Sequence, residues 1–201
     1  MRAKHISLLV KVLYTLWFVT WVPTYWRHNG WQNFLWFCDL ANFIVLVGLW
    51  KESRLLLSSQ AIGVLLIQLV WNVDFVGRLA LGFHPVGGTE YMFDAAKPMV
   101  VRSHSLFHIF VPVVLLWGVH RLGYDRRALR FQGVLAAVLL PLSYFLTDPS
   151  RNINWVFRPF GLEQVWLPPL LYLGVCMVAY PLLLLWPAHL SLHRWAGRGT
   201  K

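Results

Sequence analysis

The sequence is poor in charge and in cysteine, and it lacks the common motifs of soluble enzymes. Only 13% of its 201 residues are charged and 58% are hydrophobic, whereas roughly a quarter of a soluble domain is charged. Its two cysteines lie far apart, which gives no disulfide framework. Walker, GxGxxG, GxSxG and HExxH motifs are all absent. These absences argue against a water-soluble globule and against a familiar nucleotide-binding or zincin site.

The hydrophobic residues gather in six stretches near 20 residues long, enough for a helix to cross ~30 Å of hydrocarbon. We place these spans at about residues 6–26, 32–50, 55–73, 103–120, 128–147 and 165–187. The connectors are short, and no linker rich in Ser, Pro and Gly separates the spans. The sequence therefore predicts an all-α polytopic membrane protein, with one transmembrane domain over residues 1–201.

The basic residues are distributed unevenly between the two sides of this topology. The formal net charge is +10, from 18 Lys and Arg against 8 Asp and Glu, a balance that in a soluble protein would suggest nucleic acid. Six spans put both termini on one side, which carries 12 basic residues against 6 on the other. The positive-inside rule then places both termini in the cytoplasm. We expect a multi-pass protein of the bacterial inner membrane that binds no nucleic acid.

Two connectors on the outer side, residues 74–102 and 148–163, are too polar to span the membrane. Both are long for a protein of this size, and both contain apolar residues that a simple tether does not need. We expect them to fold over the extracytoplasmic mouth of the helix bundle.

Polar residues within the spans are concentrated on the second and fourth. Cys38, Asp39 and Asn42 lie on the second, while His104 and His108 are one turn apart on the fourth. Both spans enter from the outside, and helical rise puts Cys38 and His108 each ~8–9 Å deep. Ionisable groups in hydrocarbon are costly and usually face the bundle interior with a partner. The thiol and an imidazole are therefore expected to share an outward-facing polar pocket.

A thiol beside an imidazole base that a third group orients is the arrangement of a cysteine nucleophile. We expect acyl transfer through a thioester, by an acyltransferase or a hydrolase, with a phospholipid-type membrane lipid as the substrate and no cofactor. Side-chain amides nearby would stabilise the oxyanion. The predicted catalytic residues are Cys38, His108, His104 and Asp39, and the predicted substrate-binding residues are Asn42, Asn72 and Asn154.

Two other interpretations stay open at this point. His104 and His108 at i and i+4 form half of a metal site, which Asp74, His84 or Asp39 could complete in a metal-dependent membrane enzyme. Alternatively, the protein is a non-catalytic binding or assembly subunit with an unidentified membrane-protein partner.

Several short motifs resemble those of a known family. They are the Cys38-Asp39 pair, the Ser-rich and aromatic approach to His108, the Asn152-Ile153-Asn154-Trp155 segment, and Pro159 followed by Trp166-Leu167. Over about residues 32–185 the chain resembles the YwaF-like bacterial six-helix membrane proteins. Those are similar to transmembrane acyltransferases of ether phospholipids and, more distantly, to the androgen-induced-gene lipid hydrolases. The resemblance implies a Cys nucleophile at Cys38 and a His base at His108 or the adjacent His104.

Overall fold

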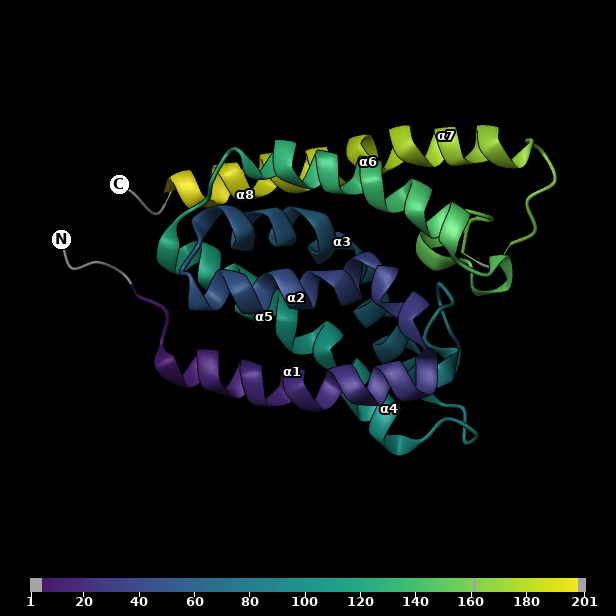
Figure 1. Cartoon of the computed structure of the whole chain (residues 1–201), viewed down its shortest axis with the longest axis horizontal. Helices are drawn as coiled ribbons and strands as arrows, with labels where there is room; N and C mark the ends of the chain where they lie inside the picture. The colour runs from purple at the N-terminus through teal and green to yellow at the C-terminus, as the bar shows by residue number, and fades with distance from the viewer. Residues whose placement is uncertain (1–4, 161, 199–201) are drawn as a thin grey trace.

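The computed structural model describes residues 5–160 and 162–198, which form a bundle of roughly aligned helices (Figure 1). The longer helices are α1 (Leu8–Asn29), α2 (Phe37–Trp50), α3 (Arg54–Leu81), α4 (Met99–Ser105), α5 (Phe107–Leu122), α6 (Ala128–Leu146), α7 (Pro169–Tyr180) and α8 (Trp186–Arg198). Short 3-10 helices are η1 (Trp31–Leu35), η2 (Glu90–Met92), η3 (Pro149–Arg151) and η4 (Ile153–Trp155), and the π-helical η5 (Pro181–Leu185) joins α7 to α8. The structure is 77% helical and the described residues contain no strand, which confirms the all-α prediction.

Five helical segments in the described residues are long and apolar enough to cross a membrane. They are Leu8–Asn29, Arg54–Leu81, Met99–Leu122, Ala128–Leu146 and Pro169–Ala196, and the shorter apolar helix Phe37–Trp50 is a sixth. Many large apolar side chains on these helices are exposed, among them Leu16, Val113 and Phe145. An apolar outer surface of this kind suits hydrocarbon better than water, as in an integral multi-pass membrane protein.

Several boundaries differ from those expected from the sequence. The second span, expected from residue 32, becomes α-helical only at Phe37, because residues 31–35 form η1. The outer connector, expected over residues 74–102, is shorter: α3 continues to Leu81 and α4 begins at Met99. The last span begins later than expected, at Pro169, and continues to Arg198 through η5. The connector was predicted to be too long because polar residues near the end of α3 and the start of α4 were assigned to it. In the structure other parts of the chain satisfy these polar groups, so the residues can lie within the helices.

Helix α3 lies at the centre of the bundle and packs against α2, α5, α6 and α8. Its Leu57 fits between two glycines, Gly48 of α2 and Gly118 of α5, where an added Cβ would lie 2.9 and 2.8 Å from the Leu57 side chain. Small residues allow membrane helices to approach this closely. The glycines therefore fix the spacing of the three helices that carry most of the site described below.

The two ends of the bundle have different connectors (Figure 1). We call the end with residues 82–98 and 147–168 the long-connector end, and the end with residues 51–53 and 123–127 the short-connector end. The start of α1 and the end of α8 both lie at the short-connector end (Figure 1). An even number of passes produces this arrangement.

Candidate active site

A cavity of about 490 Å³ lies at the long-connector end. Its walls come from the end of α1, from η1 and the start of α2, from residues 67–71 of α3, from α4 and α5, from the end of α7, and from both long connectors. This volume is in the range of small-molecule sites. Cys38, Asp39 and His108 all line it, so the structure brings together three of the four predicted catalytic residues.

Cys38 lies in the first turn of α2 and is 7% exposed. Its helix starts at Phe37, whose N–H donates to Oδ1 of Asn154 at 3.0 Å. The next two backbone N–H groups, those of Cys38 and Asp39, have no acceptor among the described residues. Free N–H groups at a helix N-terminus favour negative charge. The sulfur therefore lies beside donors that could stabilise an oxyanion formed on an acyl group.

The imidazole of His108 is fixed from several directions. Its Nδ1 lies 2.8 Å from the Ser105 carbonyl oxygen, which can only accept, so Nδ1 carries the hydrogen. The ring stacks on Trp71 with centroids 4.5 Å apart and on Phe107 at 4.0 Å. Its Nε2 makes no hydrogen bond within the described residues. The structure thus leaves the basic lone pair of Nε2 available, which is the requirement for a general base.

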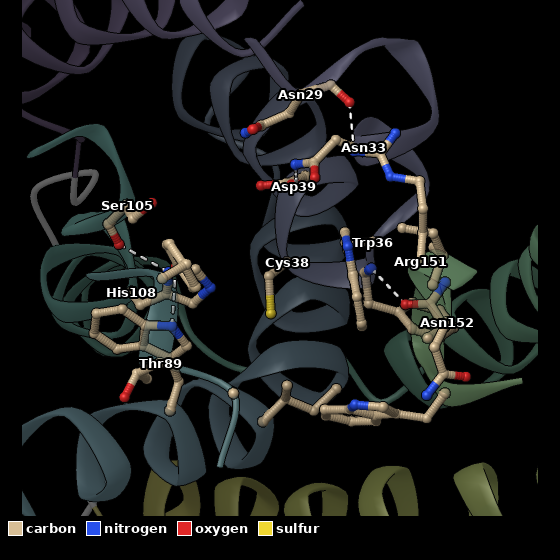
Figure 2. A pocket seen from close by; sticks show the side chains of 18 of the residues that line it. Asn29, Asn33, Trp36, Cys38, Asp39, Thr89, Ser105, His108, Arg151 and Asn152 are labelled. Atoms are coloured by element: carbon tan, nitrogen blue, oxygen red, sulfur yellow. Dashed lines mark hydrogen bonds between the residues drawn. The ribbon is translucent and has the colours of Figure 1, made fainter. Parts of the chain in front are cut away.

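Figure 2 shows the thiol of Cys38 between His108 on one side and Trp36 and Arg151 on the other. No hydrogen bond joins Cys38 and His108 in the described structure. Catalytic hydrogen bonds are often long before substrate binds and shorten in the complex. Both side chains line the same cavity.

Asp39 is 4% exposed, and its Oδ2 accepts a hydrogen bond from Nδ2 of Asn33 at 2.5 Å. In the described structure it forms no hydrogen bond or ion pair with an imidazole. The group that orients His108 is instead the Ser105 carbonyl, three residues earlier in the chain. The sequence could not distinguish these two possibilities, because a backbone carbonyl leaves no signature in the side chains.

His104, the other predicted base, does not line the cavity. Its Nδ1 bonds to the Val100 carbonyl oxygen at 2.7 Å, and its Nε2 lies 3.2 Å from the Thr20 hydroxyl of α1. The two histidines are one turn apart in sequence, but α4 ends at Ser105 and α5 begins at Phe107. His104 therefore joins α4 to α1, and His108 alone faces the site.

The three predicted substrate-binding asparagines are all engaged elsewhere. Asn42 accepts from Tyr14 and donates to the Cys38 carbonyl, and Asn72 donates to the carbonyl oxygens of Gln68 and His108. Neither lines the cavity. Asn154 does line it, yet its amide bonds to the Phe37 N–H, the Leu35 carbonyl and the Ser143 hydroxyl. These hydrogen bonds connect α1 with α2, α3 with α5, and η4 with η1, α2 and α6, and of the three asparagines Asn154 alone lines the cavity.

The residues of the alternative metal site are not arranged as ligands. Asp74 accepts hydrogen bonds from the backbone N–H groups of Val86, Gly87 and Thr89 and from the side chains of Thr89 and His84. Its two oxygens hold the connector that follows α3 in place. Within residues 5–160 and 162–198 there is no group of three His, Cys, Asp or Glu side chains that could hold a metal ion.

Several lining residues were missed by the sequence analysis. Tyr91 of η2 accepts a hydrogen bond from Trp71, and burial raises its pKa to about 12, so its hydroxyl is protonated at neutral pH. Lys97, Arg151 and Arg158 line the cavity from the two long connectors. Basic residues on the sparsely charged outer side were a signal that could have identified them.

The buried amide of Gln68 was also missed. It is fully buried next to the Cys38 thiol, and neither its Nε2 nor its Oε1 has a hydrogen-bond partner in the described structure. An unpartnered amide in an apolar interior costs free energy. It leaves a buried polar group close to Cys38.

Comparison with known proteins gave no match: no family model, curated protein or solved structure is significantly similar to the chain.

Proposed function

We propose that this protein is an intramembrane acyltransferase or lipid hydrolase in which Cys38 is the nucleophile and His108 is the base. The observation that carries the proposal is the placement of the thiol and the free Nε2 in one cavity, from helices 70 residues apart in sequence. The resemblance to the YwaF-like proteins, noted from short motifs, agrees with this assignment and is itself part of the proposal.

The chemistry follows from these positions. Sγ of Cys38 attacks the carbonyl carbon of a lipid ester while Nε2 of His108 takes the thiol proton. The oxyanion develops beside the free N–H groups at the start of α2. Cleavage of the C–O bond releases the lipid alcohol, which receives the proton from His108 and leaves a thioester on Cys38. Water or a second alcohol then attacks the thioester carbonyl carbon and gives its proton to Nε2 of His108. Cleavage of the C–S bond releases a fatty acid or a new ester, and His108 returns the proton to the Cys38 sulfur.

A membrane lipid is the substrate that fits this location. The cavity contacts half-exposed apolar side chains, Val70 on α3 and Phe160 on the second long connector. Acyl chains could extend past these residues into the hydrocarbon. We further propose that the long-connector end is extracytoplasmic and that the membrane is a bacterial inner membrane, because the basic residues are concentrated at the other end. Reporter fusions to the C-terminus and to the 82–98 connector would test this orientation.

The activity is tested with purified protein in liposomes of mixed phospholipids. We expect Cys38→Ser and His108→Gln each to lower the release of lysolipid or fatty acid by about 10²–10⁴-fold. Cys176→Ser and His104→Gln are matched controls, because neither side chain lines the cavity. Intact-protein mass spectrometry should detect an acyl adduct on Cys38 that hydroxylamine removes.

The non-catalytic alternative is supported by one observation, the lack of a hydrogen bond between Cys38 and His108. It predicts that lipid binds but is never turned over. Wild-type turnover by both Cys38→Ser and His108→Gln, or no turnover by the wild-type protein with any phospholipid, would reject the catalytic proposal.

A further inference from the structure

Three basic side chains line the cavity from the long connectors: Lys97, Arg151 and Arg158. None of them forms an ion pair with a carboxylate in the part of the chain that the structure describes. The only acidic side chain in the lining is Asp39, whose Oδ2 is bonded to Asn33. The cavity therefore carries more positive than negative charge, and its cations lack counter-ions within the described residues.

The two arginines are held in place without being neutralised. Arg151 donates to the Asn29 carbonyl oxygen at the end of α1, and Arg158 donates to the Ser150 carbonyl oxygen at 3.1 Å. Both residues are only partly exposed. A carbonyl fixes the direction of a guanidinium but is not a charged partner for it. Partial burial of such a charge favours the binding of an anion.

The connector that carries the arginines is itself locally fixed. Asn152 has a left-handed conformation with φ 48°. Its side chain accepts hydrogen bonds from the backbone N–H groups of Phe157 and Arg158 and donates one to the Arg158 carbonyl oxygen. These bonds fold residues 152–158 into a closed turn, so Arg151 and Arg158 are kept on one short stretch of the cavity wall. Exposed Asp148 on the same connector accepts hydrogen bonds from Ser150, and these bonds, with the attraction of Arg151, lower its pKa, but the two side chains form no ion pair in the described structure.

The positions of these cations relative to the thiol suggest what they bind. Arg151 and Asn152 lie on one side of Cys38 and His108 lies on the other (Figure 2). In a glycerophospholipid only a few bonds separate the ester carbonyl from the phosphate. A phosphate bound by the arginines would thus bring the ester towards the sulfur, while the apolar wall near Val70 receives an acyl chain.

We propose that Lys97, Arg151 and Arg158 form a phosphate subsite that selects lipids with an anionic headgroup. This inference rests on the proposed function, because the bound lipid is its substrate. Arginine suits the subsite, since its planar fork binds phosphate oxygens in pairs. Arginines at a membrane surface commonly contact lipid phosphates, but here the cations lie in the wall of the cavity that contains the nucleophile.

Binding is measured on the Cys38→Ser protein, so that turnover does not enter. The probe is dihexanoylphosphatidylglycerol, added to protein in a non-ionic detergent and followed by tryptophan fluorescence, since Trp36 and Trp155 line the cavity. We expect Arg158→Gln to weaken binding about tenfold and Lys97→Gln, whose side chain is exposed, about threefold. Arg130→Gln is the control, because Arg130 lies at the start of α6, near the short-connector end. This variant should bind the probe as the parent Cys38→Ser protein does.

Arg151→Gln also removes the bond to Asn29 and so could unfold the site. Arg151→Lys keeps the charge and should retain most of the affinity, and Lys97→Gln removes a side chain that makes no hydrogen bond in the described structure. If Arg158→Gln and Lys97→Gln both bind the probe as tightly as Arg130→Gln, the subsite proposal is overturned.

Two competitors identify the source of the phosphate. Dihexanoylglycerol lacks a phosphate and should compete weakly, and inorganic phosphate lacks the acyl chains and should also compete weakly. Competition by inorganic phosphate as strong as that by the lipid would overturn the assignment to a lipid headgroup. Turnover assays separate the two proposals: probe binding that depends on the arginines, with no turnover of any lipid, contradicts the acyl-transfer chemistry alone. Turnover that needs Cys38 but is unchanged, with unchanged KM, in Arg158→Gln contradicts the subsite alone.

Discussion

The two ends of the bundle use the same kinds of charged residue differently. At the short-connector end, Glu52 accepts hydrogen bonds from Lys11 Nζ, the His5 ring and the Ile6 N–H, and Asp125 pairs with Arg127. At the long-connector end, Asp74 and His84 pair with each other, but the three cations of the cavity have no carboxylate partner among the described residues.

The paired charges at the short-connector end hold connectors in place, whereas the cations that line the cavity at the long-connector end are available to a ligand. At the short-connector end, Asp125 and Arg127 pair within one connector, and Glu52 of the other short connector pairs with Lys11 and His5 near the start of the chain. The long connectors extend over the ends of α2, α3 and α5 and are held mostly by side chains that bond to backbone groups, notably Asp74, Asn152 and Asn154. Variants of these residues should therefore affect the cavity, and variants of Glu52 should not.

The largest effect is expected from Asp74→Ala. The change leaves the N–H groups of Val86, Gly87 and Thr89 without their acceptor, which should cost about 3 kcal/mol of stability. Hydrogen exchange of residues 83–90 should become much faster, while exchange at the short-connector end stays unchanged. Asp74→Asn keeps the shape of the side chain and one acceptor oxygen, so its exchange rate should lie between those of the wild type and of Asp74→Ala. Unchanged exchange in Asp74→Ala would contradict the assignment of this carboxylate as the organiser of the connector.

A smaller loss, about 2 kcal/mol, is expected from Asn154→Ala. The change removes the acceptor of the Phe37 N–H and the donor to the Leu35 carbonyl, so the start of α2 loses its position beside the cavity. Unfolding in a denaturing detergent measures the stability, and lipid turnover should fall with it. Ser58→Ala is the matched control: it removes one buried bond, to the Asp125 N–H, at the other end of the molecule. It should cost about 1 kcal/mol and leave turnover unaffected.

The smallest effect concerns pH at the short-connector end. The hydrogen bond from Lys11, with that from His5, lowers the pKa of Glu52 from 4.5 to about 2. A lowered folded-state pKa contributes stability that is fully present above about pH 4.5 and is lost as the pH falls towards 2. For a pair on the surface we expect a shift in thermal midpoint of only about 2 °C. In Glu52→Gln this shift in thermal midpoint between pH 6 and pH 3 should be absent. A larger fall of the midpoint in the variant than in the wild type would contradict the assignment.

Much of the architecture could be predicted from composition alone. Runs of apolar residues fixed the number and approximate places of the helices, because backbone groups in hydrocarbon must be satisfied within the segment itself. Boundaries were less predictable. The start of α2 is one example: Trp36 precedes it without a side-chain cap, and the acceptor for the Phe37 N–H comes from Asn154, 117 residues away in sequence. No local pattern could have indicated that helix start.

The residues that line the candidate site were only partly predictable from the sequence. Helical spacing predicted that Cys38 and His108 lie at a similar depth, and both line the cavity. The same spacing grouped His104 with His108, but the break between α4 and α5 at Leu106 turns His104 towards Thr20. The amides of Asn42 and Asn72 looked available because a sequence does not show which backbone carbonyls lie beside them.

The sequence by itself determined that this chain forms apolar helices with a few polar side chains among them, since the length and composition of each run decide whether it can cross hydrocarbon. Only the tertiary structure decided which of those polar side chains are satisfied by neighbours and which face a cavity. That outcome depends on contacts between segments far apart in the chain, such as η4 with α2 or His104 with α1. A hydrogen bond to a distant backbone atom decides whether a buried amide or imidazole is structural or free, and no spacing within one helix contains that information.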